Sequence, residues 1–189
     1  MSKVFKRTFF FLLAALIVLA AYPICTQARA ASEYLAENVE MQVNGVQCTV
    51  DFRSDYTASI WQVTDPGQSM EWDIPETIHY EIEGCSVTDF PVVRLNITSS
   101  SAANITSLTL PDTLTDLAYT KFSCFPRLTE LTIPGSVKVF PASFQNMTSL
   151  EKITFAEGVE EIASKSMVNR CSALKEIVLP DSLESITEP

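Results

Sequence analysis

Four segments of the chain share one spacing of apolar residues. Counted from the first residue of each segment, apolar side chains recur at relative positions 0, +3, +5, +9 and +12 without an insertion. A helix repeats every 3.6 residues and a strand every two, so neither element alone has this spacing. The pattern therefore predicts a unit made of two short pieces. The four segments are residues 105–117, 128–140, 150–162 and 174–186, named coil 1 to coil 4 below.

The second copy, LTELTIPGSVKVF, shows how one unit is built. Leu131 and Ile133 are two residues apart, which is the alternation of a strand with both side chains on one face. Pro134 then ends the strand. Val137 and Phe140 are three residues apart and return to the same apolar interior on a second short piece. One unit is therefore a single coil that cannot bury its apolar face alone.

The connectors between coils carry apolar pairs of their own. The pairs stand six and three residues before the next leading leucine, which suits one helical or 3-10 turn with an inward stripe. The leading residues of successive coils lie 22 to 24 residues apart, within the range of leucine-rich repeats. The pairs are Phe122 and Phe125, Phe144 and Met147, and Val168 and Cys171.

These observations predict a repeat solenoid of the leucine-rich-repeat type. It should consist mainly of short β-strands with short helical or 3-10 connectors, preceded by a small β module. Stacking neighbours buries a continuous core, which is the source of stability in such folds. Residues between the inward positions point outward, and equivalent ones in successive coils form two ladders along the stack. We predict these ladders as a ligand-binding face. Their residues are Thr109, Thr132, Thr154 and Val178, and beside them Ser107, Glu130, Lys152 and Glu176.

The repeats resemble a known family. The pattern I-P-x-S-V-x-x-[IF], followed by A/S-F-x-x-C/M-x-x-L, is similar to the BspA-like class of leucine-rich repeats, and LTIPGSVKVFPASFQNMTSL and CSALKEIVLPDSLESI match best. Ala156 departs from the pattern by replacing the proline. The resemblance implies an exported, noncatalytic bacterial surface protein with a role in adhesion. It also extends to MQVNGVQCTVDF and WDIPETIHYEIEGCSVTDF, which are similar to a short β module that often precedes such repeats.

The region before the repeats predicts three to five short strands. TASIWQV, TIHYEI and VVRLNIT alternate β-branched and aromatic residues and are separated by the turn sequences DPGQS and EGCS. We expect this module, residues 31–99, to cap the repeat array, and VVRLNIT to be an imperfect first coil. Trp61 and Trp72 are either core aromatics, which is the common case, or platforms for a glycan ligand.

The first 30 residues predict a secretory signal peptide. Lys3, Lys6 and Arg7 precede the apolar run FFFLLAALIVLAA, and Ala28-Arg29-Ala30 follows as a cleavage site. The apolar run is shorter than the ~20 residues that a membrane-crossing helix needs. The mature chain is therefore expected to be secreted or displayed on the cell surface, with no transmembrane span. Its formal charge, −10 for the whole sequence, makes nucleic acid an improbable partner.

The sequence offers little for catalysis. His79 is the single histidine, so a zinc site or a Ser/His/Asp triad would have to use it. The acidic pairs Glu160-Glu161 and Asp181/Glu184 fit a solvated face better than an acid/base couple. We expect no catalytic residues, no metal and no cofactor.

Four cysteines remain after the signal peptide. Cys124 and Cys171 lie in connectors two coils apart, which at a strand spacing of about 4.8 Å is too far for a disulfide, so both are predicted as buried thiols. Cys48 with Cys85 is the one pairing that export permits. Asn96, Asn104 and Asn146 begin N-x-T sequons.

The predicted organisation is a signal peptide over 1–30, the β module over 31–99 and the repeat array over 100–189, whose last coil is incomplete. After Ile186 the pattern calls for a further connector, so either the array continues or something else covers its last edge. The favoured function is recognition of a protein or glycan ligand on host or neighbouring cells. A structural module of a larger surface protein and a glycan-binding accessory protein are the alternatives.

Overall fold

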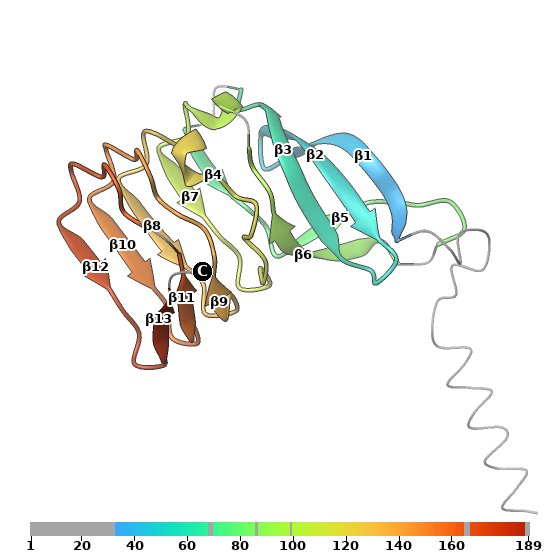
Figure 1. Cartoon of the computed structure of the whole chain (residues 1–189). Helices are drawn as coiled ribbons and strands as arrows, with labels where there is room; N and C mark the ends of the chain where they lie inside the picture. The colour runs from blue at the N-terminus through green and yellow to red at the C-terminus, as the bar shows by residue number, and fades with distance from the viewer. Residues whose placement is uncertain (1–32, 68–69, 86, 99, 165–166, 188–189) are drawn as a thin grey trace, which may run out of the picture.

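The computed structural model describes residues 33–67, 70–85, 87–98, 100–164 and 167–187, so the predicted signal peptide lies outside the described residues. The chain forms two rows of short parallel strands next to a larger twisted sheet (Figure 1). Two 3-10 turns, η1 (Ser100–Ala102) and η2 (Phe122–Cys124), are the helical elements of this described part. The fold is the predicted strand-rich leucine-rich-repeat solenoid.

The amino-terminal part is a five-stranded sheet in the order β1-β2-β3-β6-β5. Strands β1 and β2 form a hairpin whose turn residues, Asn44 and Gly45, have φ angles of 48° and 86°. Two positive φ angles match the twist of flanking strands, which is why Asn-Gly is favoured there. The five strands are β1 (Tyr34–Val43), β2 (Val46–Arg53), β3 (Ala58–Asp65), β5 (Thr77–His79) and β6 (Asp89–Leu95).

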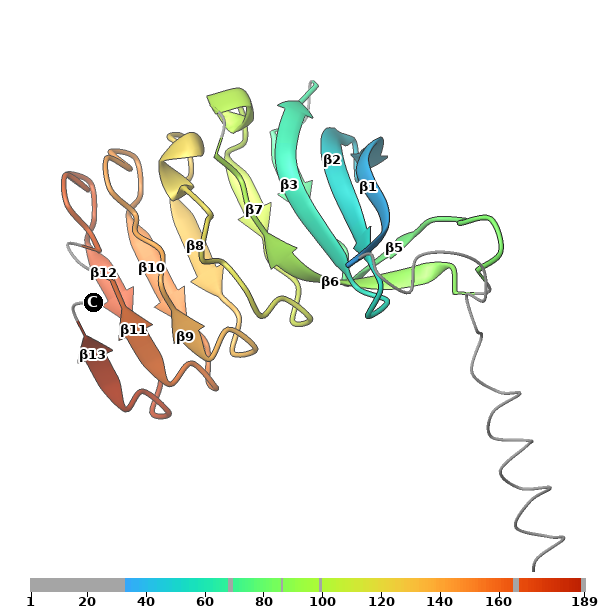
Figure 2. The same ribbon diagram turned by 45° about the vertical axis from the view of Figure 1, so that its right-hand side comes forward.

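The repeat region forms two ladders of parallel strands that run side by side (Figure 2). Register follows the repeat numbering: Ile153 lies opposite both Leu131 and Ile177, and Ile162 lies opposite both Phe140 and Ile186. The first ladder holds β8 (Glu130–Ile133), β10 (Lys152–Phe155) and β12 (Glu176–Val178), and the second holds β9 (Val139–Phe140), β11 (Glu161–Ala163) and β13 (Ser185–Thr187).

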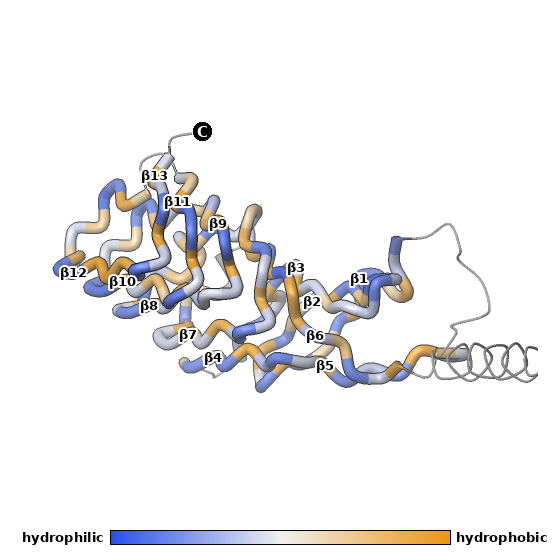
Figure 3. The backbone as a smooth tube through the Cα atoms, turned by 90° about the horizontal axis from the view of Figure 1, so that it is seen from below, coloured by the Kyte–Doolittle hydropathy of each residue, from blue (hydrophilic) through white to orange (hydrophobic). Residues whose placement is uncertain are grey.

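Inward positions are buried wherever a neighbouring coil covers them. All fifteen inward residues of coils 1, 2 and 3 are buried. Hydrophobic and hydrophilic residues alternate along each coil (Figure 3). Coil 4 differs, since Ile177, Leu179 and Ile186 are exposed. Burial thus follows the stack as well as the sequence pattern.

An additional coil precedes coil 1, and the segment VVRLNIT, predicted as an imperfect first coil, supplies part of it. Strand β4 (Glu71–Asp73) pairs in parallel with β7 (Ser107–Thr109), and Trp72 lies opposite Leu108. The second ladder is continued by β6, because Arg94 bridges to Asp116 in parallel. The two halves of this coil, β4 and β6, are separated in sequence by β5 and the loop that follows it, so we call residues 71–95 the split coil. It pairs with coil 1 across the boundary predicted near residue 99.

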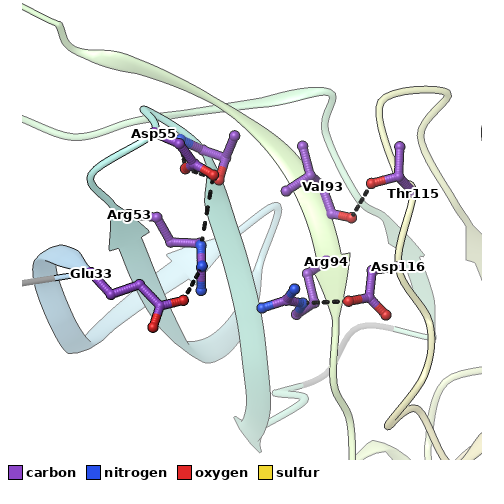
Figure 4. Close-up of polar contacts among 8 residues, drawn as sticks. Glu33, Arg53, Asp55, Val93, Arg94, Thr115 and Asp116 are labelled. Atoms are coloured by element: carbon purple, nitrogen blue, oxygen red, sulfur yellow. Dashed lines mark hydrogen bonds and ion pairs between the residues drawn. The ribbon is translucent and has the colours of Figure 1, made fainter.

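Polar contacts reinforce the junction of the split coil with coil 1 (Figure 4). The Arg94 Nε donates to the Asp116 carboxylate at 2.7 Å, and the Thr115 hydroxyl donates to the Val93 carbonyl at 3.3 Å. Arg53, also drawn there, donates to the Glu33 carboxylate within the amino-terminal sheet. The junction therefore has main-chain pairing and a half-buried ion pair.

Both ladders are interrupted between coil 1 and coil 2, at a boundary that we call the seam. Lys152 N donates to Thr129 O at 3.1 Å between coils 2 and 3, and Glu176 N donates to Glu151 O at 3.2 Å between coils 3 and 4. Among the described residues, no equivalent bond joins coil 2 to coil 1, and β7 and β8 belong to separate sheets. Within the described part of the chain, one hydrogen bond crosses the seam, from the Ser136 hydroxyl to the Leu114 carbonyl.

Large aromatic side chains fill the core at the seam. The Phe122 ring lies 6.2 Å from the Phe140 ring and 5.1 Å from the Phe144 ring, measured between centroids. The position of Phe140 is taken by Leu117 and Ile162 in the coils on either side. The same aromatic cluster continues to Phe155 of coil 3, where the strands of both ladders pair, so aromatic size alone does not account for the seam.

The connectors are less helical than predicted. η2 is the expected 3-10 turn before coil 2, whereas the described residues of the two later connectors form turns. These turns pair with each other along the stack, as Phe144 N donates to Met167 O at 2.7 Å. This bond between connectors adds to the internal i to i+3 bonds of each turn, such as Met147 N to Phe144 O and Cys171 N to Val168 O, both at 3.3 Å.

Candidate functional site

The predicted outward ladders lie on one face, which we call the ladder face. Strands β7, β8, β10 and β12 carry its eight residues, which are all exposed or partly exposed. In the register of the first ladder, Lys152 lies between Glu130 and Glu176, and Thr154 lies between Thr132 and Val178. Ser107 and Thr109 stand on β7, across the seam from this ladder.

The charges of the ladder face are partly neutralised. Lys152 Nζ lies 3.1 Å from the Glu176 carboxylate, and Lys175 Nζ lies 2.8 Å from the Glu151 carboxylate. Glu130 and the nearby Asp112 make no ion pair with any described residue. The excess negative charge on this face is therefore concentrated beside the seam.

A groove opens on the ladder face along the seam. Its volume is about 340 Å³, and coil 1 and coil 2 provide nearly all of its lining. We call it the seam groove. It brings together four of the eight predicted residues, while Lys152, Thr154, Glu176 and Val178 lie outside it. Its polar lining residues are Ser107, Thr109, Asp112, Glu130 and Thr132.

Asp112 is the lining residue that the sequence reading missed as a candidate for binding. It belongs to the turn sequence P-D-[ST]-L, in which an aspartate is common for structural reasons. Its position in the sequence could have identified it, because Asp112 lies two residues after the inward Leu110, where the strand ends and the turn begins. In the stack this places its exposed carboxylate beside β8.

A second groove, of about 500 Å³, lies elsewhere along the same seam. Residues of the connector after coil 1 and of the connector after coil 2 line it together with the end of the split coil. Asn96 is buried here, and Tyr119 is 66 % exposed. The seam therefore borders two grooves on the described surface.

The tryptophans do not form an exposed pair. Trp72 is 1 % exposed and donates its indole N–H to the Val43 carbonyl at 3.0 Å. It occupies an inward position of the split coil, opposite Leu108. Trp61 is half-buried on β3, and its indole nitrogen is buried. The idea of a glycan platform built from Trp61 and Trp72 is therefore wrong, because Trp72 is a core residue.

The cysteines are free thiols in this structure, so the suggested Cys48–Cys85 pairing is absent. Two strands, β3 and β6, separate β2, which carries Cys48, from β5, which leads to Cys85. Cys124 is buried as predicted, while Cys171 is only partly buried and donates to the Phe144 carbonyl at 2.9 Å.

Burial controls the acidity of these thiols. It raises the pKa of Cys48 to about 12, because a thiolate would lose its hydration in the sheet interior. Burial also raises the pKa of Cys124 and, despite an opposing main-chain hydrogen bond, that of Cys171. Raised values disfavour the thiolate, so these sulfurs are poor nucleophiles near neutral pH.

Other candidate chemistry is dispersed. His79 is exposed and its Nδ1 lies 3.0 Å from the Asp89 carboxylate. Over the residues that the structure describes, no group of three or more His, Cys, Asp or Glu side chains is placed to hold a metal ion. The sequon residue Asn96 is buried, whereas Asn104 and Asn146 are exposed.

None of the described segments is a helix of the length and apolarity required to cross a membrane.

Solved structures of leucine-rich-repeat proteins share this fold. A leucine-rich cell surface protein from Faecalibacterium prausnitzii is 21 % identical, with a TM-score of 0.50, over 81 % of this chain and 46 % of its own. A leucine-rich repeat protein from Treponema pallidum is 18 % identical over 79 % and 86 %, with a TM-score of 0.39. This chain thus spans about half the length of the F. prausnitzii protein. No curated protein matches it significantly.

The repeat sequence itself is diagnostic. The family model for the BspA-type leucine-rich repeat region matches residues 85–189 with six copies. The match covers more than half of the chain and includes all four coils and strand β6. This chain belongs to the BspA-type leucine-rich repeat family.

Proposed function

We propose that this protein is an exported, noncatalytic recognition module of a bacterial cell surface, which binds a macromolecular ligand through the ladder face. The family is one of bacterial leucine-rich repeat proteins, and a repeat array presents equivalent side chains at regular intervals over an extended surface. Such a surface suits a large ligand better than a small substrate.

One observation carries this proposal. The six outward residues of β8, β10 and β12 stand in register on one face, exposed or partly exposed, while the inward Leu131 and Ile153 between them are buried. Ser107 and Thr109 continue this face on β7, across the seam. Their threonines, carboxylates and lysine are not needed for the core. Adhesion to proteins or glycans of host or neighbouring cells is the role that this face supports.

The test is a charge swap that keeps stability. In the double variant Lys152→Glu with Glu176→Lys, the ion pair at 3.1 Å is retained with its direction reversed. Binding is measured on a solid-phase panel of extracellular matrix proteins and cell-surface glycans. For the partner that wild type binds, we expect the affinity of the double variant to be lower by about tenfold or more. The melting temperature should stay unchanged.

The second ladder provides a matched control. Lys138 and Glu160 form a comparable exposed ion pair at 3.2 Å, but outside the ladder face. The swap Lys138→Glu with Glu160→Lys should leave binding intact. Equal binding by wild type and by both swapped variants would refute the ladder face as the binding surface.

Assembly into a larger surface structure is the second candidate, and the exposed edge of coil 4 favours it. Ile177 on β12, Leu179 just after it and Ile186 on β13 are apolar and exposed. Light scattering over a range of concentrations should then show self-association that Ile186→Lys abolishes. A monomer at all concentrations would exclude self-assembly through this edge.

A further inference from the structure

The two strands that flank the seam groove each have an open edge. β7 pairs with β4 and β8 pairs with β10, and neither has a partner on its other side. Ser107 N donates to Met70 O and Thr109 O accepts from Ile74 N, so these residues bond toward β4. Because main-chain groups alternate sides along a strand, those of Leu108 face β8. By the same alternation, the main chains of Glu130 and Thr132 face β7.

The width of the gap between β7 and β8 determines which groups of a ligand can enter it. Paired strands lie about 4.8 Å apart, so inserting a whole strand between two others requires about twice that distance. Some Cα atoms of β7 and β8 lie within 8 Å of each other. The gap is therefore too wide for direct pairing and too narrow for a strand. A side chain of a ligand fits where a ligand backbone does not.

The groove combines carboxylates with main-chain donors and acceptors. The carboxylates of Asp112 and Glu130 are exposed and make no ion pair with a described residue, and the open strand edges present unpaired N–H and C=O groups. Lys152 is beside Glu130 in register, but its Nζ is 3.1 Å from Glu176 on the other side. The missing component is a cation with several donors.

Arginine matches these properties best. Its guanidinium is flat, always charged and carries five N–H donors with no acceptor. A flat group can lie between two strand edges and donate to carbonyls on both, while its charge is balanced by carboxylates at the opening. Lysine has a compact ammonium with three donors and reaches fewer of these acceptors at once.

We propose that the seam groove binds an arginine side chain presented by an extended segment of a partner polypeptide. The proposal rests on the recognition function of the ladder face and names the chemistry of its partner. Charge complementarity supports it, since the chain carries 23 acidic and 13 basic residues and its unpaired carboxylates on this face border the groove.

The experiment uses a blocked peptide with one arginine among serines and glycines, titrated into the ¹⁵N-labelled protein. We expect amide shifts confined to residues 107–112 and 130–134, and a loss of these shifts when citrulline replaces arginine, because citrulline keeps the shape without the charge. The lysine peptide should bind more weakly. Equal binding of the arginine and citrulline peptides, or shifts spread over the acidic surface, would overturn the proposal.

Variants sharpen the same titration. Asp112→Asn and Glu130→Gln should each weaken arginine binding about tenfold, since each removes one charge-assisted contact. Glu83→Gln removes an exposed carboxylate near the β5–β6 hairpin, far from the seam in the fold, and should have no effect. If Glu83→Gln weakens binding as much as Glu130→Gln, the attraction is general and the groove is not the site.

The two proposals can fail separately. If the swap of Lys152 with Glu176 abolishes ligand adhesion but the arginine peptide shows no preference, the ladder face binds its ligand without an arginine in the groove. If the swap has no effect on adhesion while the arginine peptide binds at the seam, the ladder face is not the main surface. Each result assigns the error to one proposal.

Discussion

Coil 3 and coil 4 have the same apolar spacing and different surroundings. Ile153 is fully buried and its counterpart Ile177 is 38 % exposed, while Ile162 is fully buried and Ile186 is 65 % exposed. Coil 3 has hydrogen-bonded neighbours on both sides, and coil 4 on one side. The difference shows that a coil supplies only half of its own core, and that the next coil supplies the rest.

The largest expected effect comes from truncating equivalent residues in these two coils. Ile153→Ala should lower the free energy of unfolding by about 2 to 5 kcal/mol, because it leaves a cavity between two packed layers. Ile177→Ala should cost below about 1 kcal/mol, since its side chain already contacts water. Urea unfolding followed by circular dichroism measures both.

Phe155 and Leu179 provide an independent pair for the same experiment. Phe155 is 1 % exposed and Leu179 is 46 % exposed at the same relative position. A polar substitution should unfold the protein at Phe155 and be tolerated at Leu179. Similar losses at both positions would mean that coil 4 is covered in solution.

A pH experiment extends the comparison to the thiols. The pKa of Cys48 is raised to about 12, so between the normal thiol pKa of 9.0 and that value the unfolded chain loses a proton that the folded chain keeps. Stability is therefore fully present below about pH 9 and falls as pH rises, by up to about 1.4 kcal/mol per unit. The half-exposed Cys171 should contribute a smaller slope.

The measurement is the free energy of unfolding from about pH 8 to about pH 10.5 for wild type, Cys48→Val and Cys171→Val. The slope should be shallower in Cys48→Val than in wild type. An unchanged slope in that variant would show that Cys48 ionises as readily in the folded chain as in the unfolded one.

Two serines at the same repeat position test the seam. The Ser136 hydroxyl donates to Leu114 O and is the hydrogen bond across the seam, whereas the Ser182 hydroxyl donates to Val159 O at 2.8 Å beside intact ladders. Each change to alanine should cost about 1 kcal/mol. Hydrogen exchange of β8 amides should accelerate only in Ser136→Ala, and equal acceleration in Ser182→Ala would contradict a weak seam.

The smallest effects are expected from exposed ion pairs. Lys138→Ala removes the pair with Glu160 at 3.2 Å, and Lys175→Ala removes the pair with Glu151 at 2.8 Å. Exposed pairs contribute below about 1 kcal/mol, whichever coil they belong to. Thermal melts should therefore show small and similar shifts, and a large shift for Lys175→Ala would indicate that coil 4 depends on this contact.

The spacing of apolar residues was sufficient to predict the solenoid and its register. Only the VVRLNIT part of the split coil was predicted, although Trp72-Asp-Ile74-Pro-Glu-Thr-Ile78 has the pattern of Leu108-Thr-Leu110-Pro-Asp-Thr-Leu114. Its second half is displaced by β5 and the loop that follows it, so a search for an uninterrupted spacing cannot find the whole coil. Insertions inside a repeat break the pattern without breaking the stack.

The candidate site was predicted in part. Alternation identified the outward residues, because a strand directs alternate side chains to opposite faces. The seam could not be predicted in this way, since a pattern of apolar positions does not tell which neighbouring coils pair through their main chains. Aromatic size is no guide either, because Phe140 contacts Phe122 across the seam and Phe155 across a paired boundary.

The seam also has a mechanical meaning. A protein that holds a ligand on a cell surface is under tension when fluid moves past the cell. Tension that separates coil 1 from coil 2 is opposed by one hydrogen bond and by aromatic packing, while every other boundary in the described array is closed by main-chain pairs. The seam should therefore yield first and extend the molecule by a limited amount, with the two bonded blocks on either side intact.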